Sequence, residues 1–165
     1  MSDKPLKTLI LYATKHGAAG EIARRIADKA DGAALHDLKQ GDVPNLAEYD
    51  CVIVGSSVYA GRIRKEAKVF LSHNTEALQS KRLGLFISGM DTGSENDVLA
   101  AAYSKELLQS AKTASFLGGI FDPDKAGFIE RLIMRIVTKK SGYISTINDE
   151  KIGDFVKALI EDPGV

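Results

Sequence analysis

Residues 14–19 combine the groups of an anion-binding loop. The segment holds a hydroxyl, two basic side chains, a glycine and two alanines, and it leads into a helical pattern: Thr14, Lys15, His16, Gly17, Ala18 and Ala19. The free amides and positive dipole end of a helix N-terminus suit a phosphate. The segment matches neither G-x-G-x-x-G nor G-x-x-x-x-G-K-[ST], which disfavours a dinucleotide or ATP. We therefore predict a simpler phosphate-binding loop, with an ordinary strand-to-helix turn as the alternative.

Two further polar loops follow strand-length apolar runs. One comprises Ser57, Val58, Tyr59, Ala60 and Gly61, and the other comprises Ser88, Gly89, Met90 and Asp91. Tyr59 is either a stacking platform for a planar ligand or a packing residue. His16, His36 and His73 are far apart in sequence without metal-ligand spacing, so we predict no metal site. Cys51 begins an apolar run, which is typical of a small core residue rather than a reactive thiol.

Strand-length runs alternate with segments of helical period along the chain. The predicted strands span residues 6–13, 33–38, 49–57, 82–88 and 114–121, and the predicted helices span 18–30, 62–71, 98–111 and 149–160. This alternation favours a single α/β domain over residues 1–165, a doubly wound sandwich around a five-stranded parallel sheet of order 2-1-3-4-5. Ligands of such sheets bind beyond the carboxyl ends of strands one and three, where all three loops would meet.

Composition narrows the class of partner. The 165 residues include 22 basic and 22 acidic side chains, so the net charge is zero and gives no overall attraction to nucleic acid. No apolar run reaches the roughly 18 residues of a membrane-spanning helix. The first residues do not resemble a signal peptide, and a lone cysteine forms no internal disulfide. A cytoplasmic location is therefore expected.

Two stretches resemble the flavodoxin superfamily. They are LILYATKHGAAGEIA, which is similar to its phosphate loop, and DCVIVGSSVYAGRIRKEAKVFL, which is similar to its next flavin-contacting loop and helix. A third stretch, FLGGIFDPDKAGFIERLIMRIVTKKSG, places an inserted amphipathic segment at about residues 122–148. That insertion makes the chain most similar to the menaquinone-dependent protoporphyrinogen IX dehydrogenases, which are flavodoxin-fold enzymes of haem biosynthesis.

The resemblance implies FMN as the cofactor. Residues 14–19 would meet its phosphate, residues 57–61 one side of the isoalloxazine ring, and residues 88–91 the other. The family carries polar residues at the positions of Ala18 and Ala19, and the last residue of its phosphate loop, here Ala19, is usually Thr or Ser. Loss of one hydroxyl is expected to weaken phosphate binding about ten- to a hundredfold. Positive charge from Lys15 or His16 would offset part of that loss.

The inserted segment bears on partners. Apolar residues follow a helical stripe from Phe128 to Lys140, and Arg131, Arg135 and Lys139 recur every four residues beside it. Such a helix can lie on an anionic membrane at the inner face, as would suit an enzyme that passes electrons to a quinone. Alternatively the stripe packs on the domain, or it forms a wall of a substrate pocket.

Three functions remain open from the sequence. The first is an FMN-dependent oxidoreductase that oxidises a porphyrinogen and reduces a quinone; the cofactor does the chemistry, so we assign no catalytic side chain. The second is a flavodoxin electron carrier, which the balanced charge and the insertion disfavour. The third is an FMN-free interaction module, which the two alanines of the first loop keep open.

Overall fold

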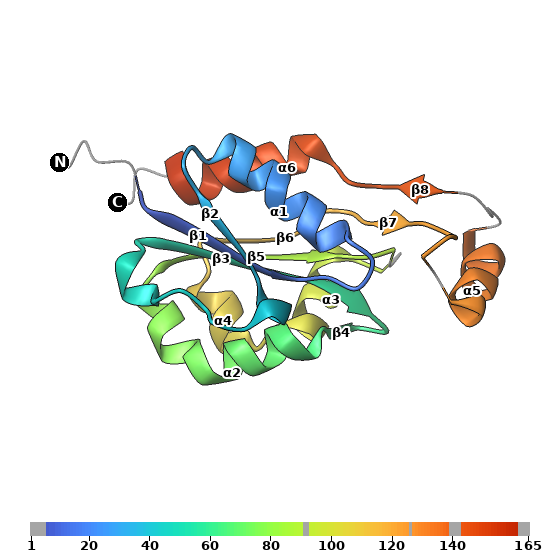
Figure 1. Ribbon diagram of the computed structural model, residues 1–165, viewed down its shortest axis with the longest axis horizontal. Helices are drawn as coiled ribbons and strands as arrows, with labels where there is room; N and C mark the ends of the chain where they lie inside the picture. Colours follow the sequence, from blue (N-terminus) through green and yellow to red (C-terminus); the bar gives the residue numbers. More distant parts are fainter. Residues whose placement is uncertain (1–5, 91–92, 126, 139–142, 162–165) are drawn as a thin grey trace.

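The computed structural model describes residues 6–90, 93–125, 127–138 and 143–161, and it is built on a parallel sheet (Figure 1). Five strands of this sheet lie in the order β2-β1-β3-β5-β6. Their bounds are β1 (Thr8–Ala13), β2 (Ala34–Asp37), β3 (Cys51–Tyr59), β5 (Arg82–Ser88) and β6 (Thr113–Phe116). All four pairings between them are parallel. The predicted order is therefore confirmed, with β5 and β6 as the fourth and fifth strands of the parallel set.

Helices cover both faces of the sheet (Figure 1). One face carries α1 (Ala18–Lys29) and α6 (Asp149–Val156), which continues as a π-helical turn (Lys157–Glu161). The other face carries α2 (Lys65–Gln79), α3 (Glu95–Ala102) and α4 (Lys105–Ser110). Alternate strand residues supply two apolar cores, one on each face. Strands covered on both faces must be apolar throughout, which explains the continuous apolar runs in the sequence.

The predicted helix 62–71 begins later and ends later than expected. Residues Arg62–Ile63 form a short strand, β4, that pairs antiparallel with the end of β3. The connecting residues Ala60 and Gly61 both have positive φ, 52° and 78°, as a two-residue hairpin turn requires. The helix α2 therefore starts at Lys65, after the hairpin has closed, and runs to Gln79.

The predicted helix 98–111 is two helices. Ser94 caps α3 by accepting from the Asp97 amide, so this helix begins before the predicted start. Ser104 caps α4 in the same way, through the Leu107 amide. Between them Tyr103 is extended and buried, and its hydroxyl donates to the Phe86 carbonyl oxygen at 2.5 Å. This tertiary contact interrupts an otherwise helical pattern.

The predicted strand 114–121 divides at its glycines. Gly118 has φ of 94°, which turns the chain away from β6 and out of the main sheet. The chain continues as β7 (Ile120–Phe121), which pairs antiparallel with β8 (Ile144–Ser145). Helix α5 (Phe128–Thr138) lies beyond this two-stranded ribbon, outside the layers of the sandwich (Figure 1). Lys139 and Lys140, predicted to end this helix, lie outside the described residues.

Gly153, in the middle of α6, offers a simple stability test. A Cβ atom at this position would meet nothing within 4 Å, and the backbone is helical. Gly153→Ala is expected to raise the free energy of unfolding by about 0.5–1 kcal/mol, because alanine loses less entropy in a helix. Urea denaturation measures the change. The control is Gly32→Ala, which has equal open space but a φ of 75° and should therefore destabilise the protein.

Candidate functional site

The three predicted loops converge on one cavity of about 160 Å³ beyond the carboxyl ends of β1, β3 and β5. Each loop contributes to its wall, and four lining residues come from elsewhere: Arg64, Ile120, Phe121 and Glu130. The predicted residues in the wall are Lys15, His16, Ala18, Ser57, Val58, Tyr59, Ser88, Gly89 and Met90. Thr14, Gly17, Ala19, Ala60 and Gly61 belong to the same loops without lining the cavity. Asp91 lies outside the described residues.

The first loop is shaped by Gly17. This residue has φ of 99° at the N-cap of α1, and its amide donates to Thr14 Oγ1 at 2.9 Å. The Thr14 hydroxyl therefore stabilises the turn through a hydrogen bond inside the loop. Ala18 and Ala19 begin the helix and are buried; Ala19 lies completely buried in the core between α1 and the sheet, whereas Ala18 lines the cavity. Core packing explains Ala19, and neither alanine gives the loop a hydroxyl for an anion.

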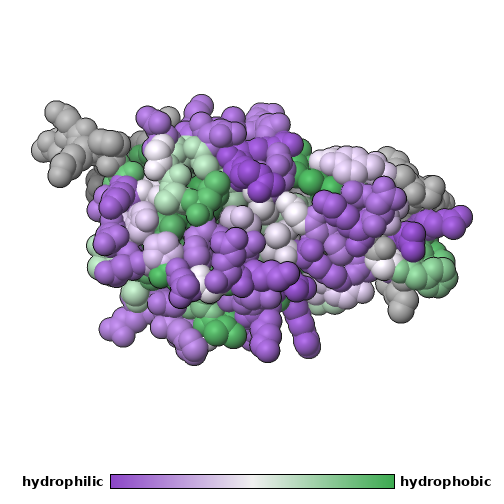
Figure 2. All heavy atoms as spheres, viewed as in Figure 1, coloured by the Kyte–Doolittle hydropathy of each residue, from purple (hydrophilic) through white to green (hydrophobic). Residues whose placement is uncertain are grey.

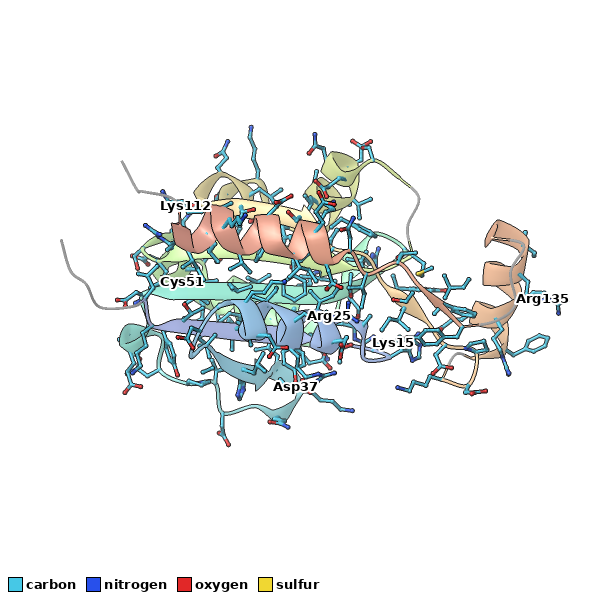
Figure 3. The ribbon with its side chains drawn as sticks, turned by 90° about the horizontal axis from the view of Figure 1, so that it is seen from above. Lys15, Arg25, Asp37, Cys51, Lys112 and Arg135 are labelled. Atoms are coloured by element: carbon cyan, nitrogen blue, oxygen red, sulfur yellow. The ribbon has the colours of Figure 1, made fainter. Side chains whose placement is uncertain are left out.

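Lys15 and His16 are both paired with Glu130 of α5. Lys15 Nζ forms an ion pair with Glu130 Oε1, and His16 Nε2 lies 2.9 Å from Oε2. Burial opposes ionisation of this carboxyl group, but the hydrogen bonds and charges of Lys15 and His16 outweigh it, so the pKa of Glu130 lies below its ordinary value. Figure 3 shows Lys15 at the end of the sheet that faces α5.

The second loop presents Tyr59 at the β3–β4 hairpin. Its side chain is 57% exposed, so the packing interpretation is disfavoured and a free aromatic face remains. Lys15 Nζ lies 5.1 Å from the centre of the ring, a cation–π distance. The neighbouring Ser56 is buried, and its hydroxyl accepts from the Arg64 amide at 2.9 Å. This bond fixes the chain as it leaves the hairpin and enters α2.

The third loop is held by close backbone packing. The Gly89 amide donates to the Gly118 carbonyl oxygen at 3.1 Å. A Cβ atom on Gly119 would lie 2.4 Å from the Gly89 carbonyl oxygen, so only glycine fits there. The two glycines after β6 therefore position the loop after β5 as well as turning their own chain.

Three buried polar atoms at the cavity have no hydrogen-bond partner among the described residues: Ser57 Oγ, Ser88 Oγ and Arg64 Nε. Arg64 Nε lies 3.9 Å from Glu66 Oε2, beyond hydrogen-bond distance. Buried polar groups are ordinarily hydrogen-bonded to protein, water or a ligand, so three such atoms around one cavity mark it as the candidate binding site. Apart from the charged cluster of Lys15, His16 and Glu130, the rest of the wall is apolar or aromatic, as in small-molecule sites generally.

Sequence reasoning missed Arg64 and Glu130 for different reasons. Arg64 follows the hairpin turn, and recognition of that turn would have placed it beside Ser57. Glu130 is 115 residues from Lys15, and no local pattern joins the two. The single acid in the basic segment 128–140 was the available signal.

Other potential reactive groups do not add to this site. Cys51 is fully buried, and burial raises the pKa of its thiol to about 11, which suppresses the reactive thiolate near neutral pH. Within the described ranges, no group of three or more His, Cys, Asp or Glu side chains is arranged to hold a metal. Across the same ranges, no helix combines the length and apolar character needed to cross a bilayer.

Known proteins share this architecture. Protoporphyrinogen IX dehydrogenase [quinone] of Escherichia coli K12 is 21% identical over 150 residues, covering 83% of this chain and 81% of that protein. Oxidised Flavodoxin 2 from Bacillus cereus aligns with a TM-score of 0.61 and 22% identity over 94% of this chain and 98% of its own. Rubredoxin oxygen:oxidoreductase from Desulfovibrio gigas aligns with a TM-score of 0.60 and 16% identity. That alignment covers 94% of this chain but 35% of the larger protein.

These alignments confirm the expected flavodoxin-like fold. A family model described as Flavodoxin domain matches residues 9–147, which is most of the chain and includes the three loops of the cavity. The chain belongs to the flavodoxin domain family.

Proposed function

We propose that this chain binds FMN in the cavity formed by the three loops and acts as an oxidoreductase. The observation that carries the proposal is a set of buried atoms that have no hydrogen-bond partner among the described residues, Ser57 Oγ, Ser88 Oγ and Arg64 Nε, on a wall that is mainly apolar beyond its charged cluster. An isoalloxazine ring has apolar faces and an edge of carbonyl and ring-nitrogen groups. The wall therefore suits such a ring.

Each part of the site has a role toward the cofactor. The loop at Gly17 supplies backbone amides at the start of α1 for a phosphate. The Ser57 and Ser88 hydroxyls and the Arg64 guanidinium supply hydrogen bonds to polar atoms of the ring. Tyr59 offers an aromatic face for stacking. Ile120 and Phe121, on β7, exclude water from one side of the cavity.

The proposed reaction is oxidation of a porphyrinogen with a quinone as acceptor. When bound, FMN supplies two-electron redox chemistry. Each such oxidation takes two hydrogens from the porphyrinogen, and the quinone receives an equal number to become a quinol. The similarity to the Escherichia coli dehydrogenase supports this choice of substrates. The protein contributes binding, orientation and exclusion of water, and we assign no side chain as acid or base.

FMN titration tests the cofactor. Purified protein is titrated with FMN while visible absorbance and flavin fluorescence are followed. Saturable quenching with a dissociation constant in the micromolar range or below is expected. Absence of binding at millimolar FMN would contradict both the enzyme and the carrier functions and would favour an FMN-free module. Porphyrinogen oxidation with added quinone then separates the enzyme from a carrier, which would instead cycle electrons with a reductase.

We also propose that α5 contacts an anionic membrane, at the inner face of which a quinone would be reached. Phe128, Leu132 and Ile136 are 74%, 47% and 69% exposed, so these three do not pack on the domain. Arg131 and Arg135 are exposed beside them. Charged and apolar side chains adjoin at the α5 end of the molecule (Figure 2), and Arg135 points outward from it (Figure 3).

Liposome co-sedimentation checks the membrane contact. Substitution of Arg131 and Arg135 together by glutamine is expected to weaken binding to vesicles rich in phosphatidylserine about thirtyfold, because each cation near an anionic surface contributes about 1 kcal/mol. Phosphatidylcholine vesicles are the control and should respond little to the change. Equal binding of the wild type to both vesicle types would contradict an electrostatic contact.

A further inference from the structure

The Glu130 carboxylate contacts the two basic side chains of the first loop. Both of its oxygens are engaged: Oε1 by Lys15 Nζ and Oε2 by His16 Nε2, the latter at 2.9 Å. Its side chain is 20% exposed, against 37% for Lys15 and 29% for His16, so the three groups form a partly sheltered cluster. The cluster joins α5 to the loop between β1 and α1.

Apart from the backbone amides at the start of α1, the loop itself supplies few other groups that attract a phosphate. Ala18 and Ala19 carry no hydroxyl, and Thr14 Oγ1 accepts from the Gly17 amide within the loop. Lys15 and His16 are the basic side chains that this loop itself supplies. Among the described residues that line the cavity, Glu130 is the one carboxylate, and it is directed at these two groups.

A phosphate at this loop and an ionised Glu130 would compete. Both would draw on Lys15 and His16 as partners, and like charges close together repel one another. A phosphate would therefore bind beside the carboxylate at a cost or displace it from the two basic groups. In both cases the pairing of Lys15 and His16 with Glu130 reduces the attraction of the loop for a phosphate.

We propose that Glu130 is a specificity-determining residue, an internal carboxylate that competes with the cofactor's phosphate for Lys15 and His16. The inference rests on the proposed flavin function, and it identifies Glu130 as the residue that sets the preference for a phosphorylated flavin. In consequence the chain distinguishes weakly between FMN and riboflavin, which has the same ring without the phosphate. Glu130, which lowers the preference for FMN over riboflavin, belongs to the inserted segment and not to the flavodoxin core.

The test compares two flavins on two variants. Glu130→Gln keeps the shape of the side chain and removes its charge. FMN affinity is expected to rise roughly tenfold at low ionic strength, while riboflavin affinity stays within about twofold. The matched control is Glu76→Gln, which removes the same charge from an exposed position on α2 and should change neither affinity. A fall in FMN affinity, or an equal change for both flavins, would overturn the proposal.

Inorganic phosphate separates this inference from the proposed function. Flavin-free protein is titrated with phosphate while the amide resonances of residues 17–20 are followed by NMR. Glu130→Gln is expected to bind phosphate about tenfold more tightly than the wild type. Tighter phosphate binding without any flavin binding would refute the flavin function and leave the competition standing. Equal phosphate affinity, or no phosphate binding by either protein, would refute the competition.

Discussion

Replacement of Gly55 by alanine is expected to lower the free energy of unfolding by about 3 kcal/mol. Gly55 in β3 is paired with Phe86 in β5, and the Phe86 ring lies over it. A Cβ atom at position 55 would be 2.0 Å from Cζ of that ring. The ring is fully buried and meets Phe155 edge-on, with 6.3 Å between centroids, so it has no free space to move into. Urea denaturation measures the loss.

A control in the neighbouring strand tests the cause. At Gly84 in β5 an added Cβ would lie 2.9 Å from the ends of the Leu159 and Phe155 side chains, a milder conflict. Gly84→Ala should therefore cost less than Gly55→Ala. A Phe86→Leu background should also reduce the cost of Gly55→Ala, because a smaller side chain relieves the contact. A cost under about 0.5 kcal/mol for Gly55→Ala in the wild type would refute the account.

Joint replacement of Ser57 and Ser88 by alanine is expected to separate stability from binding. Both hydroxyl oxygens are buried without a hydrogen-bond partner among the described residues, so their removal should raise the stability of the flavin-free protein by about 1 kcal/mol. The same change removes two hydrogen bonds to a bound flavin and should weaken its affinity about thirtyfold. Thermal unfolding without flavin and a fluorescence titration measure the two effects.

Two exposed serines, Ser72 in α2 and Ser80 at its C-cap, provide the control for this double substitution. The hydroxyl groups of Ser72 and Ser80 donate to the carbonyl oxygens of Val69 and Ala77, away from the cavity. Their joint replacement by alanine should leave flavin affinity unchanged. Unaltered flavin affinity in the Ser57 and Ser88 variant would show that these hydroxyls do not contact the cofactor.

The sequence was sufficient for the order of the parallel strands because burial on both faces leaves an uninterrupted apolar signal. It was less informative where a contact from elsewhere in the chain decides the local structure. Ala60 adopts a positive φ that alanine seldom takes, so the β3–β4 hairpin was not predicted. Tyr103 leaves the helical pattern to bond the Phe86 carbonyl oxygen in the sheet. The hydrophobic periodicity marks neither feature, although Ser104 after Tyr103 is a local signal for a helix start.

In the candidate site, too, local patterns were predictable and contacts between distant parts of the chain were not. Lys15, Ser57 and Ser88 were predicted because each follows an apolar strand, and parallel strands bring their carboxyl ends to one edge. The partner of Lys15 was not predicted, because Glu130 arrives on a helix held outside the sandwich. Conversely, the sequence presents Ala19 only as the loss of a hydroxyl from an anion-binding loop. In the structure Ala19 is completely buried, so core packing explains why a small apolar residue stands there.

The ribbon of β7 and β8 bears on the chain-entropy cost of the insertion. Hydrogen bonds hold the two ends of the inserted segment side by side: Asn148 N donates to Leu117 O at 3.2 Å, and Thr146 N donates to Gly119 O at 2.8 Å. For a loop whose ends are already joined, closure entropy grows only with the logarithm of length, so each doubling costs about 0.6 kcal/mol. The sandwich can therefore carry a longer or shorter segment at this point with little loss of stability. The length of that segment is therefore only weakly coupled to the stability of the core.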